Sequence, residues 1–231
     1  MSVILIVGDS WGVPNYYGLP GAPKEHHTEF LLRNSGHTVY NCAINGGSNL
    51  ESLARAQHLI NSFPRPAEWL VWFHTEFFRE SNLVNYAHTI DRNIRDIAHE
   101  VYSKFSLFVK DNNLKLCVIG GQSQLEPELF DYMDPTFYIT DWRSTILKTV
   151  PPKSSHLVSR CFEWVPSLIK DKREAIRVLD EQKQILDSMQ ESEHFPDNCH
   201  PGTIPHRELV LTLHEVFNGT TATPATKIMV E

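Results

Sequence analysis

The segment "SVILIV" (residues 2–7) most limits what this chain can fold into. It is an uninterrupted run of apolar, mostly β-branched residues, a pattern typical of a strand that is covered on both faces. Similar runs follow at 68–75 and 115–121. Strands of this kind belong to parallel sheets with helices packed on each side.

Helical patterns separate these apolar runs. We expect helices over 24–36, 48–60 and 85–111, and one more strand over 37–44. Ser48 is the expected N-cap of the second helix. The alternation of strands and helices predicts an α/β fold with a central parallel sheet, built by right-handed crossovers.

The second half of the chain lacks this alternation of strands and helices. Residues 122–169 carry five prolines and many aromatic residues without a clear period, and we interpret them as an ordered insertion or lid. A polar helix is expected over about 170–192 and a last helix over about 203–217. The prediction is a single domain over 1–218, followed by a C-terminal tail over 219–231.

Composition excludes several classes of function. The formal net charge is -7 and no basic stripe occurs, which disfavours binding to nucleic acid. The apolar run near the N-terminus is too short for a secretory signal or a membrane span, which favours a cytoplasmic protein. The four cysteines form no CxxC pair, and the twelve histidines show no metal-binding spacing, so we expect reduced thiols and neither metal nor cofactor.

Polar or glycine-bearing residues follow three of the expected strands. In open parallel sheets, ligands bind at the carboxyl ends of the strands. A fourth polar signature precedes the last helix. The four signatures are "GDS" (8–10), "NGG" (45–47), "HTE" (74–76) and "DNCH" (197–200).

Together these signatures contain the groups that serine catalysis needs. A serine nucleophile needs a base that takes its proton, and the base needs a group that fixes its tautomer. Ser10 is the candidate nucleophile, His200 the candidate base and Asp197 the candidate orienting group. The backbone N–H groups of Ser10 and Gly46 are candidate donors to the oxyanion. We expect Asp9 to brace the turn.

The motif "GDSWG" resembles the first block of the SGNH (GDSL-like) hydrolases. "NCAINGGSN" resembles their second block, in which a glycine supplies an oxyanion-hole N–H, and Gly46 falls on that glycine. "DNCHPG" resembles their Asp-x-x-His block. The resemblance covers most of the chain except 122–169. It implies a three-layer α/β/α, flavodoxin-like SGNH hydrolase fold and ester hydrolysis through an acyl-serine intermediate.

The third block departs from the family pattern, because Glu76 stands where members have an oxyanion-binding asparagine. Three interpretations stay open. Glu76 is protonated in an apolar setting and donates, or Asn45, Asn49 or His74 donates instead, or the site binds without turnover. Pairing with Arg79 would favour the last two. The segment "WFHTEFFRE" resembles a variant third block of bacteriophage-encoded members, which would allow a virion-associated location.

Candidate substrate-binding residues lie in or beside the first three motifs, and one lies in the 122–169 stretch. They are Trp11, Asn45, Asn49, His74 and Trp142. A flat indole such as that of Trp142 can stack on a sugar ring, although a packing role in the core or lid is the stronger interpretation.

The sequence therefore supports a serine esterase for a small-acyl ester, with a carbohydrate-linked ester as one form of the substrate. One alternative is a non-catalytic module of the same fold that binds a glycan or a protein partner. Another is an acyltransferase on the same site. A nucleotide-binding role is disfavoured, because the chain has no GxxxxGK[ST] motif and "GDSWG" lacks the glycines of a dinucleotide loop.

Overall fold

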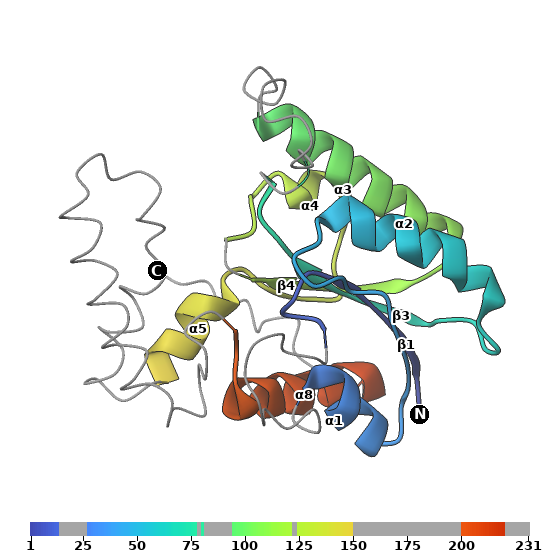
Figure 1. The fold of residues 1–231 in the computed structure, drawn as a ribbon, viewed down its shortest axis with the longest axis vertical. Coiled ribbons are helices and arrows are strands. Elements are labelled where there is room, and N and C mark those ends of the chain that lie inside the picture. Colours follow the sequence, from blue (N-terminus) through green and yellow to red (C-terminus); the bar gives the residue numbers. More distant parts are fainter. Residues whose placement is uncertain (14–26, 78–79, 81–93, 122–123, 150–199, 220–231) are drawn as a thin grey trace.

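The computed structural model describes residues 1–13, 27–77, 80, 94–121, 124–149 and 200–219 of the chain (Figure 1). The described strands form one sheet in the order β2-β1-β3-β4-β5, and every neighbouring pair is parallel. This is the order of flavodoxin-like sheets, so the predicted α/β fold with a central parallel sheet is confirmed. The strands are β1 (Val3–Gly8), β2 (Thr38–Asn41), β3 (Trp69–His74), β4 (Lys115–Gly120) and β5 (Phe137–Ile139).

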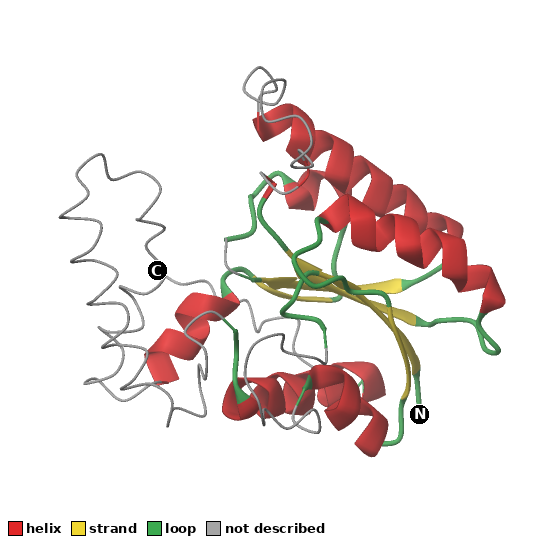
Figure 2. Ribbon diagram, viewed as in Figure 1, coloured by secondary structure: helices red, strands yellow, loops and turns green. Residues whose placement is uncertain are grey.

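Helices cover both faces of the sheet, as Figure 2 shows. On one face lie α1 (Thr28–Asn34), α8 (Thr203–Asn218) and, at the edge, α5 (Trp142–Thr149). On the other lie α2 (Asn49–Leu59), the short α4 (Leu129–Tyr132) and α3 (Ile94–Asp111). A short 3₁₀ turn, Ile60–Ser62, extends α2.

The hydrophobic core is divided by the sheet into two clusters. Successive residues of a strand point to opposite faces, so Ile4 and Ile6 join the cluster under α1 and α8, whereas Val3, Leu5 and Val7 join the cluster under α2 and α3. All six residues of β1 are buried, which explains why its sequence shows no polar alternation.

The N-terminus of α2 is fixed by carboxylates as well as by its predicted cap. Ser48 and Glu51 form a capping box, in which each side chain accepts a hydrogen bond from the other's backbone N–H. The Glu80 carboxylate, from beyond β3, accepts from the N–H groups of Asn49 (2.7 Å) and Leu50 (3.1 Å). Glu80 therefore ties the segment after β3 to the start of α2.

Strand β5 is not among the strands predicted from the sequence. Its three residues pair in parallel with β4, so this part of the 122–169 stretch belongs to the sheet. The strand is short and follows Pro135, and such a run carries too little period to stand out. The rest of the expected insertion or lid (150–169), the polar helix over 170–192 and the tail from 220 lie outside the described residues.

The cysteines of the described residues are Cys42 and Cys117, and both are buried free thiols. Cys161 and Cys199 lie outside that part of the chain. No helix within the described ranges is long and apolar enough to cross a membrane.

His74, the last residue of β3, is buried among aromatic rings with neither ring nitrogen hydrogen-bonded among the described residues. Its ring lies 5.1 Å from those of Trp72 and Phe77 and 6.1 Å from that of Tyr102, measured between centroids. Burial lowers the pKa of His74 from 6.5 to about 3. The imidazole is therefore neutral in the folded protein at moderate acidity, while it is protonated in the unfolded chain.

We predict that His74→Leu makes the protein less sensitive to acid. Below pH 6.5 His74 binds a proton in the unfolded chain, whereas in the folded protein it stays unprotonated down to about pH 3. This group therefore costs about 1.4 kcal/mol of unfolding free energy per pH unit in that window. Urea unfolding at pH 7 and pH 5 measures the difference, with exposed His58→Leu as the control. Equal pH dependence in the His74 variant and in the unsubstituted protein would contradict the prediction.

Candidate active site

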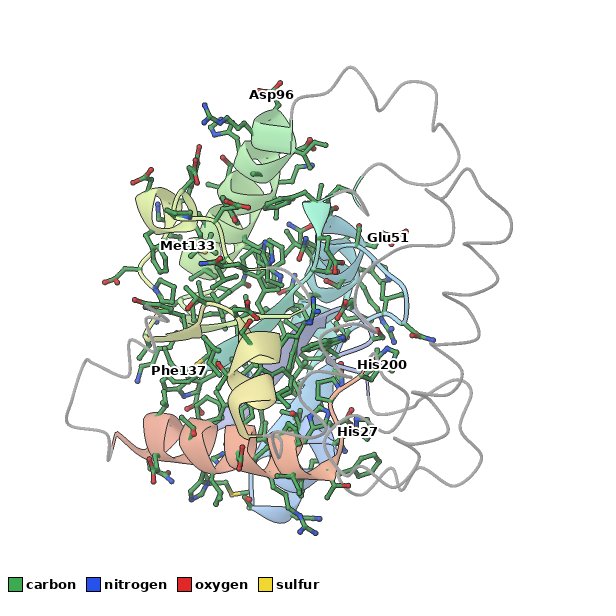
Figure 3. All side chains as sticks on the ribbon, turned by 90° about the vertical axis from the view of Figure 1, so that its left-hand side faces the viewer. His27, Glu51, Asp96, Met133, Phe137 and His200 are labelled. Atoms are coloured by element: carbon green, nitrogen blue, oxygen red, sulfur yellow. The ribbon has the colours of Figure 1, made fainter. Side chains whose placement is uncertain are left out.

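Ser10 and His200, 190 positions apart in the sequence, meet at the carboxyl edge of the sheet. Ser10 lies two residues beyond β1, and His200 lies three residues before α8. His200 Nε2 is 2.8 Å from Ser10 Oγ, and the contact is partly buried. Figure 3 shows His200 near the end of the molecule where α8 begins. The site lies beside the junction of β1 and β3, where the strand order reverses.

The turn that carries Ser10 depends on a glycine and on a carboxylate. Gly8 has φ +131°, and a Cβ there would lie 2.3 Å from the Phe73 carbonyl oxygen, so a side chain has no room. Asp9 Oδ1 accepts a hydrogen bond from the Trp11 N–H at 2.9 Å, which confirms the expected bracing role. The Gly12 N–H donates to the Asp9 carbonyl at 3.0 Å. The backbone around Ser10 is thereby held in a tight turn.

A second loop brings Gly46 to the same edge. The Ile44 N–H donates to the Gly8 carbonyl at 2.9 Å, which places this loop beside the end of β1. The Gly47 N–H closes a turn onto the Ile44 carbonyl, with Gly46 at φ +67°, a value that favours glycine. Among the described residues, the N–H groups of Ser10 and Gly46 have no hydrogen-bond acceptor. Both N–H groups therefore stay candidate donors to an oxyanion.

Thr75 connects the end of β1 to the end of β3. Its Oγ1 lies 3.0 Å from Asp9 Oδ2 and 2.9 Å from Glu76 Oε2. Because a hydroxyl has one proton, Thr75 donates to only one of these carboxylates at a time. Thr75 has no role predicted from the sequence, because nothing in the local pattern shows that Asp9 faces it across 66 positions.

Asn49 holds the Thr75 backbone from the start of α2. Its Oδ1 accepts hydrogen bonds from the Thr75 N–H (3.0 Å) and the Trp72 indole N–H (2.9 Å), while its Nδ2 donates to the Thr75 carbonyl (2.9 Å). The side chain is completely buried. The Asn49 amide is therefore occupied by hydrogen bonds within the fold, which disfavours its predicted role in binding substrate or an oxyanion.

Three other candidates have buried side chains. Trp11 and Trp142 are 1% and 3% exposed, and their rings pack edge to face at 5.6 Å. Because both rings are almost completely buried, neither indole presents a face on which a sugar could stack. His74 lies on the opposite face of the sheet, against Trp72 and Tyr102.

The remaining candidates are Asn45, Glu76 and Asp197. Asn45 is exposed beside Gly46, and Glu76 is half-buried beside Thr75. Asp197 and Arg79 lie outside the described residues. Within the described ranges, no cluster of three or more His, Cys, Asp or Glu side chains is placed to hold a metal ion.

No protein-family model matches this chain, and no curated protein matches it. Similar solved structures include TesA, with a TM-score of 0.48 and 13% identity over 94% of this chain and 98% of that chain. The psychrotrophic esterase EstA from Pseudoalteromonas sp. has a TM-score of 0.47 and 11% identity over 95% of this chain and 98% of that chain. AlinE4, an SGNH-hydrolase family esterase, has a TM-score of 0.46 and 15% identity over 83% of this chain and 97% of that chain. Similarity at this level carries no argument about function.

We predict that Thr75→Val destabilises the protein by about 1–3 kcal/mol, because it removes a buried hydroxyl that serves two carboxylates. Thr212→Val is the matched control, since the Thr212 hydroxyl donates only to a carbonyl on the exposed side of α8. Guanidinium unfolding at pH 7 measures both variants. Equal losses in the two variants would show that the link between β1 and β3 contributes nothing.

Proposed function

We propose that this chain is a serine ester hydrolase with Ser10 as its nucleophile. The observation that carries the proposal is the 2.8 Å contact between Ser10 Oγ and His200 Nε2 at the edge where parallel sheets bind ligands. A hydroxyl needs a base at this distance to become a nucleophile. Two free backbone N–H groups on the adjoining turns give the site the donors that acyl transfer requires.

In the proposed reaction, Ser10 Oγ attacks the ester carbonyl carbon while His200 Nε2 takes the hydroxyl proton. The carbonyl oxygen becomes an oxyanion, which the N–H groups of Ser10 and Gly46 stabilise. The C–O bond to the alcohol then breaks, and His200 returns its proton to the leaving oxygen. Water repeats the sequence on the acyl-serine, which releases the acid and restores Ser10.

The base needs an orienting group on its second nitrogen, and Asp197 stays our prediction for it. It precedes His200 by three residues, so one turn of chain can bring its carboxylate to His200 Nδ1–H. A carboxylate in this position holds the imidazole in the tautomer that leaves Nε2 free to accept.

The third oxyanion donor has fewer candidates than the sequence alone left open. Asn49 has its amide committed to the Thr75 backbone, and His74 is buried on the other face of the sheet. Two backbone donors, with Asn45 or Glu76 as the added side chain, form the oxyanion hole that we propose. The binding-module alternative is retained because Glu76 replaces an amide donor.

The proposed substrate is an ester with a small acyl group. The burial of Trp142 removes the stacking surface that favoured a carbohydrate-linked ester, so the proposal does not depend on a sugar. An acyltransferase would form the same acyl-serine and would differ only in the acceptor that replaces water.

We predict that Ser10→Ala lowers kcat for p-nitrophenyl esters by at least about 10⁴-fold, because no other group can form the acyl intermediate. Hydrolysis of acetyl to octanoyl esters, followed by absorbance, measures this and also defines the acyl length. A fluorophosphonate should label the unsubstituted protein at Ser10 and leave the variant unlabelled. Circular dichroism checks that both proteins are folded.

Ser62→Ala is the matched control, because Ser62 is exposed and its hydroxyl donates only to the Leu59 carbonyl. It should hydrolyse esters at the unsubstituted rate. Unchanged hydrolysis by Ser10→Ala would refute the mechanism. Folded protein that neither turns over esters nor reacts with the fluorophosphonate would favour the binding module.

A further inference from the structure

The side chain of Asn41, the last residue of β2, joins the two turns of the candidate site. Its Nδ2 donates to the Gly12 carbonyl oxygen at 2.8 Å, and its Oδ1 accepts from the Ala43 N–H at 2.9 Å. Gly12 lies two residues after Ser10, and Ala43 lies three residues before Gly46. One amide group therefore connects the turn of the candidate nucleophile to the loop of the second candidate oxyanion donor. We call these two hydrogen bonds the Asn41 link.

Ser10 lies between two connections to that loop. Before it in the chain, the Gly8 carbonyl accepts from the Ile44 N–H at 2.9 Å. After it, the Gly12 carbonyl accepts from Asn41. The first connection is between backbone atoms, whereas the second depends on one side chain. Without the Asn41 amide, the turn that carries Ser10 would lose its hydrogen bond to the loop on the side of Gly12.

The partners of Asn41 determine the orientation of its amide. The Gly12 carbonyl and the Glu29 carboxylate oxygen, 2.9 Å from Nδ2, both need a donor. The Ala43 N–H needs an acceptor. These partners agree on a single orientation, in which both Nδ2 hydrogens and the Oδ1 oxygen are used.

Glu29, in the first turn of α1, holds the amide from a neighbouring element. It is buried, and its Oε1 pairs with Arg33 Nη2 at 2.8 Å. The same Nη2 donates to the Val39 carbonyl of β2 at 2.8 Å. Because α1 and β2 together fix the carboxylate, one N–H of Asn41 is held there and the other points at Gly12.

We propose that Asn41 is a positioning residue that sets the separation of the Ser10 turn and the Gly46 loop, and thereby the geometry of the oxyanion hole. This inference rests on the proposed hydrolase function. Oxyanion donors act only when they are preorganised at hydrogen-bond distance from the place where the charge develops. The two proposed backbone donors belong to different turns, so their separation has to be fixed by a contact between those turns. The Asn41 link is such a contact.

The effect of losing the link is expected in the chemical step. The oxyanion develops in the transition state, so misplaced donors should lower kcat and leave KM nearly unchanged. A misplacement of about 1 Å can lower the rate by roughly 100-fold. A merely structural role would lower stability without changing kcat of the folded enzyme.

The main test is Asn41→Asp, which keeps the shape of the side chain and replaces its donor by an oxygen. At pH 8 that oxygen would face the Gly12 carbonyl and the Glu29 carboxylate, which are both acceptors. We expect kcat for p-nitrophenyl esters and the rate of fluorophosphonate labelling at Ser10 each to fall by about tenfold or more at nearly constant KM. A smaller fall in the folded variant would overturn the proposal. Asn41→Ala removes the link without adding a charge and should give the same result if the Asp variant does not fold.

Asn112→Asp is the matched control. Asn112 is also half-buried, and its Nδ2 donates to the Phe108 carbonyl at 2.8 Å. It lies between the end of α3 and the start of β4, at the edge of the sheet opposite to Ser10. This variant should lose stability and keep kcat.

The second test adds Glu29→Gln to Asn41→Asp. The new amide can donate to the new carboxylate, so urea unfolding should show part of the lost stability restored. The Gly12 carbonyl still has no donor, so kcat should stay low. Recovery of kcat together with stability would show that the bond to Gly12 does not matter, and would overturn the proposal.

The third test detects the link without any substrate. In ¹⁵N-labelled protein, the side-chain N–H protons of Asn41 should exchange with solvent about tenfold or more slowly than those of the exposed Asn45, because hydrogen-bonded protons are protected. The signals are assigned by their loss in Asn41→Asp and Asn45→Asp. Equal exchange of the two side chains would overturn the proposal.

The outcomes separate this inference from the proposed function. Unsubstituted protein that neither hydrolyses esters nor reacts with the fluorophosphonate refutes the hydrolase, and with it any role of Asn41 in catalysis. Active protein in which Asn41→Asp and Asn41→Ala keep full kcat refutes the positioning role alone.

Discussion

The close approach of Gly8 to the backbone of Phe73 is the constraint on which the site depends. With a hydrogen in place of a side chain, β1 can run to its last residue directly against β3 and then turn out of the sheet. Asp9 and Ser10 therefore emerge beside the residues that follow β3, which makes the contact from Asp9 to Thr75 possible. Any larger residue at position 8 would push the two strand ends apart.

Buried and partly buried polar side chains hold the loops at this edge. Asn41 donates to the Gly12 carbonyl and accepts from the Ala43 N–H, so it binds the turn after β1 to the end of β2. Asn49 does the same for the residue after β3, and Thr75 joins the two. Each of these groups would be costly to leave unpaired, so the network has one arrangement in which it is satisfied. That rigidity is what a preorganised oxyanion site requires.

The sequence predicts those features of the fold that depend on neighbouring residues. The apolar runs of β1, β3 and β4 and the cap at Ser48 are local patterns, and the structure confirms them. Pairings between distant segments leave no such pattern, which is why Thr75 and the Thr28–His206 bond across 178 positions were missed. At Trp142 the sequence favours packing over a sugar site only weakly, because an indole suits both, and its burial in the fold supports the packing role.

Three histidines show how the same side chain acquires different properties from its place in the fold. His74 ends a central strand among aromatic rings and has no polar partner among the described residues, so burial alone determines its charge. His206 is equally buried, but its Nδ1 has a polar partner in the Thr28 hydroxyl at 2.8 Å, and burial in the first place lowers its pKa. His200 is only partly buried and has Ser10 at Nε2. A base has to exchange protons with substrate and water, and of these three histidines the partly buried His200 is the one whose surroundings suit that proposed role.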